Sequence, residues 1–240
     1  RLSELEPGDK DLDQAINQFL LLVVQKISGS DPKMAQAIIR SKRLNPRHIT
    51  EGCYAMLFDT FTRLLKKSYQ WGDFFKDYKI SQVVFMRSQR DYPDVFHSRL
   101  QFLNSIFSNG RISADTKYQL LDPLKDTTRS LITMMNMSAN YQGPVIELFL
   151  SIVSGEGRFT PEIVSWEIID EFHRIFRDTT TYTKVLLIKF YCALFLCTDL
   201  KTIILLIKKD LLEDLLEVFD MDDENLINEA AQVLEACAFC

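Results

Sequence analysis

Glycine and proline are scarce in this chain, and it has no long apolar run. The 240 residues include 8 Gly and 7 Pro, too few for the many turns of a β-sandwich. The longest apolar stretch, residues 185–198, contains Lys189 and is too short to span a bilayer. No segment of useful length alternates apolar and polar residues with the period of a strand. These absences favour a fold of buried helices joined by short loops.

Residues that usually carry chemistry are also few. The three histidines, His48, His97 and His173, do not lie at metal-ligand spacing from a cysteine or from one another. The five cysteines are an odd number on mostly apolar faces, which predicts reduced thiols in an intracellular protein of the cytoplasm or nucleus. Cys237 and Cys240 form a lone Cys-x-x-Cys motif, whereas a structural zinc needs four ligands.

Two further patterns have structural interpretations. Gly155-Glu156-Gly157 lacks the full glycine fingerprint of a phosphate loop, so we interpret it as a turn between repeats. Asp222-Asp223 lies where a helix would begin, and the helix dipole favours acidic residues there. Spacing nominates no nucleophile with a neighbouring base. We therefore expect no catalytic activity, no cofactor and no metal.

The charge is unevenly distributed along the chain. The net charge is −5, yet residues 31–130 hold 17 Lys or Arg against 10 Asp or Glu, and residues 200–240 hold 3 against 10. A gradient of this kind can orient a partner during encounter, although solvated helix faces would look the same. The alternatives for the basic part are an acidic protein or peptide, nucleic acid, or no specific partner, and the overall negative charge argues against a nucleic-acid module. The candidate partner-binding residues are Arg40, Lys42, Arg43, Arg47, Lys66 and Lys67.

Apolar residues spaced by three and four predict helices along the whole chain. Arg1 begins the sequence, so we expect a segment of a longer protein. No linker of low complexity interrupts it, so residues 1–240 are predicted to form a single domain. The predicted helices cover residues 11–27, 32–39, 50–67, 93–109, 115–122, 127–138, 143–154, 160–177, 180–198, 200–208, 209–220 and 223–239.

The C-terminal third repeats itself at an offset of 43 residues. Ile168, Phe172 and Phe176 align with Leu211, Leu215 and Phe219, and Phe190-Tyr191 aligns with Val233-Leu234. A helical period near 40 residues is typical of armadillo and HEAT repeats. The sequence therefore predicts an all-α, right-handed α-solenoid, with close helix crossing at Ala230-Ala231.

The last 75 residues resemble armadillo repeats in their paired leucines, acidic junction and Ala-Ala followed by Val-Leu-x-Ala. Armadillo proteins that bind nuclear-localisation peptides present Trp and Asn on successive third helices. The corresponding residues here are Gln232 and Ala236, and Lys189 and Ala193. An importin-α-like peptide groove is therefore not expected.

A narrower resemblance rests on the order of landmarks over about 190 residues. The chain is similar to the central domain of the SMEK family, regulatory subunit 3 of protein phosphatase 4, although Phe190-Tyr191 replaces the family's usual Glu-Phe and some spacings slip. The landmarks are Thr50-Glu51-Gly52, Leu57, Phe58 and Phe61, Phe74-Phe75, residues 80–84, Asp91-Tyr92-Pro93, His97-x-Arg99, Phe102-Leu103, residues 187–193, Leu216-Glu217-Val218 and Met221-Asp222-Asp223.

This resemblance implies a non-catalytic, protein-binding scaffold, with a phosphatase catalytic subunit or an acidic peptide segment as partner. It supplies no catalytic residues, because the family holds a phosphatase complex and its substrates. Two alternatives remain open: a scaffold for a GTPase, kinase or cytoskeletal protein, and a chromosome-associated HEAT-type subunit.

Overall fold

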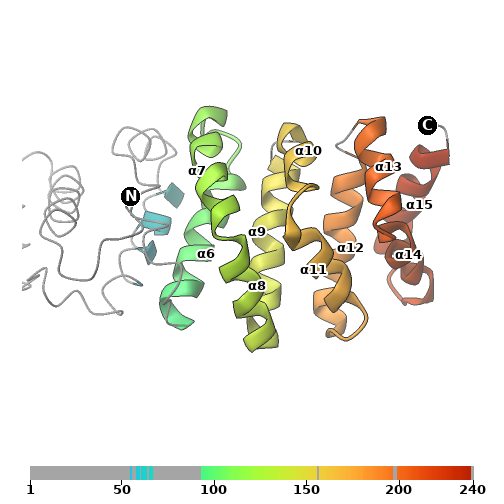
Figure 1. Cartoon of the computed structure of the whole chain (residues 1–240), viewed down its shortest axis with the longest axis horizontal. Helices are drawn as coiled ribbons and strands as arrows, with labels where there is room; N and C mark the ends of the chain where they lie inside the picture. Colours follow the sequence, from blue (N-terminus) through green and yellow to red (C-terminus); the bar gives the residue numbers. More distant parts are fainter. Residues whose placement is uncertain are drawn as a thin grey trace, which may run out of the picture.

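The computed structural model describes residues 93–155, 157–196 and 199–238, together with residues 55, 58, 59, 61–63, 65 and 66. Every regular element in these ranges is a helix (Figure 1). The predicted all-α class is confirmed for this part of the chain. The predicted helices at residues 11–27 and 32–39 lie outside the described residues.

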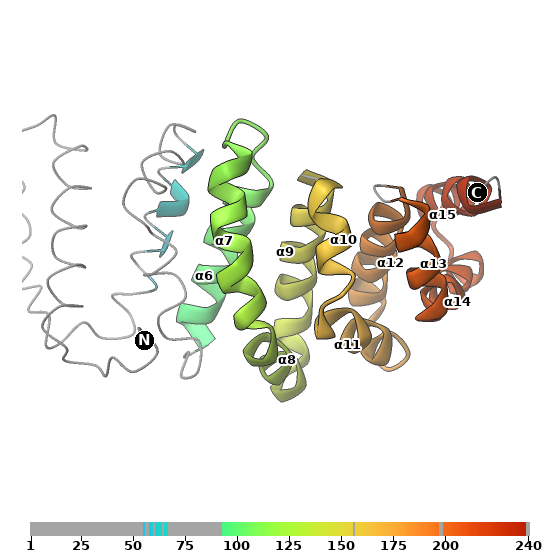
Figure 2. The ribbon, with the colours of Figure 1, turned by 45° about the horizontal axis from the view of Figure 1, so that its top comes forward.

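The helices form two rows that run the length of the described chain (Figures 1 and 2). The first, which we call the α9 row, contains α6 (Pro93–Phe107), α9 (Gln142–Gly155), α12 (Thr181–Leu196) and α15 (Glu224–Ala238). Each of these four helices packs on the next one in this order. They therefore lie side by side as a continuous layer.

The second layer, which we call the α11 row, packs on one side of the first. It contains α7 (Ala114–Asp126), α8 (Thr128–Met137), α10 (Thr160–Ile163), α11 (Glu167–Phe176), α13 (Leu200–Lys208) and α14 (Leu211–Leu216). Short 3₁₀ turns, η3 (Ala139–Tyr141), η4 (Gly157–Phe159) and η5 (Glu217–Asp220), join the rows. Before each of α9, α12 and α15, the chain forms two helices of the α11 row. Within this row α8 packs on α11, and α11 packs on α14.

The offset of 43 residues aligns α11 with α14 and α12 with α15. Ile168, Phe172 and Phe190 are buried, and so are their counterparts Leu211, Leu215 and Val233. The repeated apolar positions therefore occupy the same side of equivalent helices. This correspondence explains why a period was visible in the sequence.

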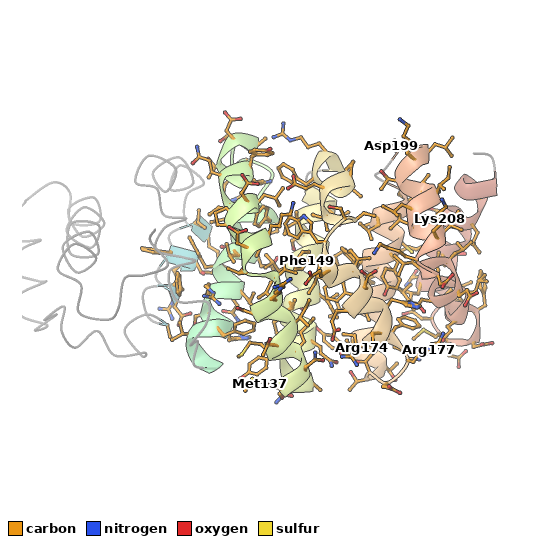
Figure 3. The ribbon with its side chains drawn as sticks, viewed as in Figure 1. Met137, Phe149, Arg174, Arg177, Asp199 and Lys208 are labelled. Atoms are coloured by element: carbon orange, nitrogen blue, oxygen red, sulfur yellow. The ribbon has the colours of Figure 1, made fainter. Side chains whose placement is uncertain are left out.

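Aromatic side chains connect the two rows in the core. The Phe149 ring of α9 meets Phe172 of α11 edge to face, with centroids 5.6 Å apart, and Phe172 meets Phe190 of α12 at 5.4 Å. Trp166 also packs on Phe149, at 5.9 Å. Figure 3 shows Phe149 in the middle of the described helices, surrounded by other side chains.

The prediction of one helix over residues 160–177 is wrong. The chain turns between α10 and α11, where Ser165 N donates to the Glu162 carbonyl and Trp166 N donates to the Ile163 carbonyl. Trp166 then adopts an extended backbone with ψ 148°. The turn lets both Val164 and Trp166 enter the core, which a straight helix could not do because their positions would diverge around its axis.

The interpretation of residues 155–157 as a turn agrees with the structure, since α9 ends at Gly155 and η4 begins at Gly157. Gly155 is required there for space. A Cβ atom at this position would lie 2.5 Å from the carbonyl oxygen of Phe107 on α6. The end of α9 therefore approaches the backbone of α6 more closely than any side chain would allow.

We expect Gly155→Ala to lower the free energy of unfolding by about 1–3 kcal/mol, because two helix backbones would have to separate. Gly110→Ala is the matched control, since a Cβ at Gly110 meets nothing within 4 Å. Chemical denaturation of the two variants measures the difference. Equal stability of both would show that α6 and α9 can separate freely at this point.

The predicted close crossing at Ala230-Ala231 is half right. Ala230 is fully buried, whereas Ala231 is exposed. The buried side of α15 follows Leu226, Ala230 and Val233, which are spaced by four and three along the helix. Ala231 is one residue, or about 100°, away from that side.

We therefore expect Ala230→Leu to overpack the contact of α15 with its neighbours and to cost about 1–3 kcal/mol. Ala231→Leu should leave stability almost unchanged. Thermal unfolding of the two variants tests the assignment directly. A larger loss in Ala231→Leu would mean that α15 is rotated relative to this description.

Candidate binding surface

The outward side of the α9 row is a continuous surface formed by four helices. We call it the α9-row face and define it by the exposed or partly exposed polar side chains that follow one another along each helix. These are His97, Gln101 and Asn104 of α6, Glu147, Ser151 and Ser154 of α9, Tyr182 and Lys189 of α12, and Asn225, Glu229 and Gln232 of α15.

Hydrogen bonds between neighbouring helices hold this face together. Tyr182 of α12 donates its hydroxyl to Glu147 of α9 over 2.7 Å, and Ser151 of α9 donates to Asn104 of α6. The bond to Glu147 is the main reason that the pKa of Tyr182 is raised. These bonds fix the positions of side chains that still reach the solvent.

The polar side chains of the face suit hydrogen bonding, and Leu186, Ala193 and Leu196 of α12 add apolar area in the same stripe. The face offers amides, hydroxyls and a few charges of both signs, and Gln101 contacts the His97 ring at 2.8 Å. Tyr182 is its one large aromatic side chain among the described residues, and it is 61% exposed. Such a surface can hold an extended polar segment along several helices, because each helix adds a few donors and acceptors.

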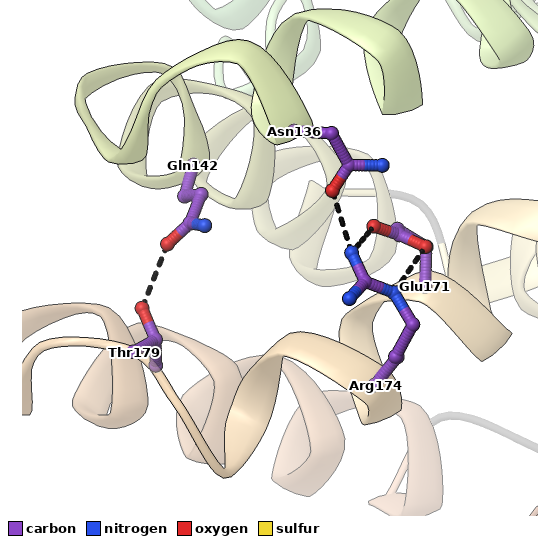
Figure 4. Close-up of polar contacts among 5 residues, drawn as sticks. All are labelled: Asn136, Gln142, Glu171, Arg174 and Thr179. Atoms are coloured by element: carbon purple, nitrogen blue, oxygen red, sulfur yellow. Dashed lines mark hydrogen bonds and ion pairs between the residues drawn. The ribbon is translucent and has the colours of Figure 1, made fainter.

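The α11 row is held together by a different set of polar contacts. Arg174 of α11 donates to Glu171 of its own helix and to Asn136 of α8, in each case at 2.5 Å (Figure 4). The loop after α11 is joined to the other row, because Thr179 donates its hydroxyl to Gln142 of α9 over 2.7 Å. Hydrogen bonding to Glu171 raises the pKa of Arg174. These residues are committed to joining successive helices.

A histidine–aspartate pair joins α11 to α14 in the interior. His173 Nδ1 lies 2.7 Å from a carboxylate oxygen of Asp214, and the Asp214 side chain is only 3% exposed. Burial raises the pKa of Asp214 and outweighs the opposing effect of His173. The hydroxyl of Tyr191 on α12 is buried nearby, and burial together with the Asp214 charge raises its pKa.

The pair has the form of the orienting half of a catalytic triad, but Cys192, which follows Tyr191 on α12, is not activated. Burial raises the pKa of the Cys192 thiol to about 12, which keeps it in the unreactive thiol form. Among the described residues no three His, Cys, Asp or Glu side chains are grouped to hold a metal ion. The contact between His173 and Asp214 is best understood as a link between helices.

Most of the predicted partner-binding residues lie outside the described part of the chain. These are Arg40, Lys42, Arg43, Arg47 and Lys67. Lys66 is described, and it is exposed on a helical segment. The His173–Asp214 link was not predicted, because 41 residues separate its members and no local motif connects them.

No protein-family model and no curated protein matches the chain in sequence. No helix within the described ranges is both long enough and apolar enough to cross a membrane.

Two crystal structures from the Northeast Structural Genomics Consortium, each described as an engineered protein, resemble the chain in fold. One has a TM-score of 0.66 and 13% identity, with 98% of this chain and 94% of that chain covered. The other has a TM-score of 0.66 and 15% identity, with 98% and 96% covered. At such identities the likeness concerns the fold alone.

Proposed function

We propose that this protein is a non-catalytic scaffold that binds other proteins through the α9-row face. The observation that carries the proposal is the side-by-side packing of α6, α9, α12 and α15. Surfaces of this kind recognise long segments by adding contacts from successive helical units. The face is fixed internally by the Tyr182–Glu147 and Ser151–Asn104 bonds, so little ordering would be needed on binding.

The finer form of the proposal is an armadillo-like, right-handed α-solenoid. It is supported by units of two shorter helices followed by a long one and by the 43-residue period. The polar contacts between consecutive units support it as well, for example Arg129–Glu167 at 3.3 Å and Lys184–Glu217 at 3.0 Å. In such a stack each unit contacts mainly its neighbours.

The narrower proposal is a regulatory subunit of a phosphatase 4-type complex. Its support is the order of the SMEK-like landmarks along the sequence. Several of these landmarks, including Phe102, Leu103 and Leu187, are core residues. Core residues in the same order would be expected if this chain and the SMEK family shared a fold. The scaffold would hold a substrate segment near a catalytic subunit and raise its effective concentration, into about the millimolar range for a short tether.

Affinity purification of the tagged chain, followed by mass spectrometry, tests the proposal. We expect the wild type to recover a phosphatase 4-type catalytic subunit. A double variant of the face, Gln101→Arg with Lys189→Glu, should lose it, because both side chains are exposed on the α9-row face. Lys125→Glu is the matched control, since Lys125 is exposed on α7 in the other row.

Each alternative has its own outcome. Reproducible recovery of a GTPase, kinase or cytoskeletal protein, with no phosphatase subunit, removes the phosphatase assignment and leaves the general scaffold. Salt-sensitive binding to DNA instead would favour a chromosome-associated subunit. Loss of the partner in Lys125→Glu, with retention in the double variant, would move the binding surface to the α11 row.

The basic segment around residues 40–47 is proposed as a second contact, for an acidic protein segment. We expect Arg43→Glu combined with Arg47→Glu to weaken partner capture and to flatten its dependence on salt. The motivation is the excess of basic residues over 31–130 in a chain of net charge −5. Binding that survives intact at low salt would show that these side chains are only solvated.

A further inference from the structure

Exposed apolar side chains gather at one end of the structure. The described residues expose ten large apolar side chains, and seven of them lie between positions 196 and 219. Five of the seven define what we call the terminal face, and each is 41–50% exposed. They are Leu200, Ile204 and Ile207 of α13, Leu216 of α14 and Phe219 of η5.

Two polar contacts show which way these side chains point. Lys209, at the end of α13, pairs with Asp170 of α11, so that side of α13 faces back along the row. At 100° per residue, Leu200, Ile204 and Ile207 lie about 140–180° around the helix from Lys209. They therefore face away from α11.

The same geometry holds for α14. Asp214 contacts His173 of α11, and Leu216 lies about 160° around the axis from it. Phe219 follows one 3₁₀ turn later in η5 and lies on the same side as Leu216. Figures 1 and 2 both place α13 and α14 at the end of the array, beyond α11. In Figure 3, Asp199 and Lys208 mark the two ends of α13 at this edge. The terminal face is thus the open end of the α11 row.

The preceding unit shows what such positions do when another unit covers them. The 43-residue offset aligns Ile207 with Val164 and Phe219 with Phe176. Val164 and Phe176 are fully buried in the unit on which α13–α15 pack. At these two positions the terminal face therefore exposes apolar residues whose counterparts in the preceding unit are buried, and His173, the counterpart of Leu216, contacts the following unit through Asp214. Pro161, the counterpart of Ile204, is exposed.

Charge indicates what would cover it. Glu213 aligns with Asp170 at the same offset, and Asp170 receives a lysine from the following unit. Glu213 is exposed and takes part in none of the ion pairs between described residues. Asp220 and Asp222 are exposed close by. Lys201 and Lys208 are exposed on the flanks of α13, about 80–100° from the side that faces α11. Along α14 and η5 every charged residue is acidic.

We propose that the terminal face binds an amphipathic helix of a partner protein, with apolar residues on Leu216 and Phe219 and a basic residue facing Glu213. This surface is separate from the α9-row face and goes beyond the function proposed above. A second copy fits less well, because two terminal faces meeting end to end would bring Glu213 and Asp220 close to their own copies. Anionic lipid would meet the same repulsion.

Designed peptides test the proposal with the full 240-residue chain. The probe is a labelled helical peptide of leucine and lysine, about 18 residues or five turns long, with the leucines on one side. One control replaces every lysine with glutamate, and the other scrambles the leucine–lysine order. Fluorescence anisotropy should show saturable binding of the first peptide only.

Variants then locate the site. Leu216→Ser with Phe219→Ser should weaken binding of the lysine peptide more than about tenfold, and Glu213→Lys should weaken it about fivefold. Tyr118→Ser and Met137→Ser remove exposed apolar side chains elsewhere and should leave binding unchanged. All these side chains are exposed, so unchanged thermal unfolding confirms that each variant is folded.

Three results would overturn the proposal. Equal binding of the glutamate or scrambled peptide would show unspecific adhesion. A dimer in sedimentation velocity that Leu216→Ser dissociates would assign the face to a second copy. Binding to phosphatidylserine vesicles that Leu216→Ser abolishes would assign it to a membrane surface.

Discussion

Phe172→Ala is expected to lower the free energy of unfolding by about 3–5 kcal/mol, the range for truncating a buried aromatic residue. The Phe172 side chain is fully buried. Its ring meets Phe149 of α9 and Phe190 of α12 edge to face, at 5.6 and 5.4 Å. Its removal therefore breaks two aromatic contacts and leaves a cavity between the rows. Equilibrium denaturation with urea measures the loss.

The matched control is Phe219→Ala, the same substitution at a position that is 46% exposed. We expect it to cost less than about 1 kcal/mol, because much of the ring is already in water. Similar losses at both positions would contradict the packing described for α9, α11 and α12. If Phe172→Ala lowered the free energy of unfolding only slightly, the core would have to close around the missing ring.

His173→Ala is expected to cost about 2–4 kcal/mol, because it leaves the buried Asp214 carboxylate without its partner. His173 is partly exposed, so we expect a smaller loss of stability than for breaking a fully buried ion pair. Asp214→Asn should cost much less, since it keeps a hydrogen-bond acceptor and removes a charge that burial disfavours. The double variant, His173→Ala with Asp214→Asn, should recover part of the loss in His173→Ala.

The pH dependence of this link has a definite sign. The pKa of Asp214 is raised above its ordinary value of 3.8 by burial, so the folded protein keeps this proton to a higher pH than the unfolded chain does. The stability that this proton contributes is complete below about pH 3.8 and is lost as the pH rises through the folded-state pKa. Wild type should therefore lose stability relative to Asp214→Asn from about pH 4 upward.

Unfolding free energies of wild type and Asp214→Asn, compared at about pH 3.5 and at higher pH, measure this difference. The comparison is cleanest in the His173→Ala background, where no histidine contacts the carboxylate. A wild-type protein that gains stability relative to the Asp214→Asn variant as the pH rises would reverse the sign. The His173 link would then outweigh the burial of the carboxylate.

Periodicity predicted most helices in the described ranges because apolar stripes record burial. The stripe from Ile168 to Phe176 is buried as expected. The turn at Val164–Trp166 was not predicted, because apolar residues continue through it. The spacing of apolar residues alone does not distinguish one helix from two helices joined by a buried turn. The burial of Ala230 follows from its spacing of four and three residues from Leu226 and Val233. Two adjacent alanines do not show by themselves which of the two faces the core.

The proposed binding surfaces were harder to predict. The α9-row face is polar and varied, so nothing in the sequence separates its residues from other solvated positions. The His173–Asp214 link depends on the packing of α11 against α14, which brings together residues 41 positions apart. The apolar residues of α13 were visible in the sequence, but their exposure follows from the position of α13 at the end of the row.

Hydroxyl-radical footprinting of the chain, alone and in complex with the protein recovered by affinity purification, tests the central claim most directly. Tyr182 is 61% exposed on the α9-row face, and Tyr118 is 53% exposed on α7 in the other row. The two tyrosines have similar exposure and the same reactivity, so each controls for the other. We predict that the complex protects Tyr182 from labelling and leaves Tyr118 unchanged. Protection of Tyr118 with full labelling of Tyr182 would contradict the assignment of the α9-row face as the binding surface.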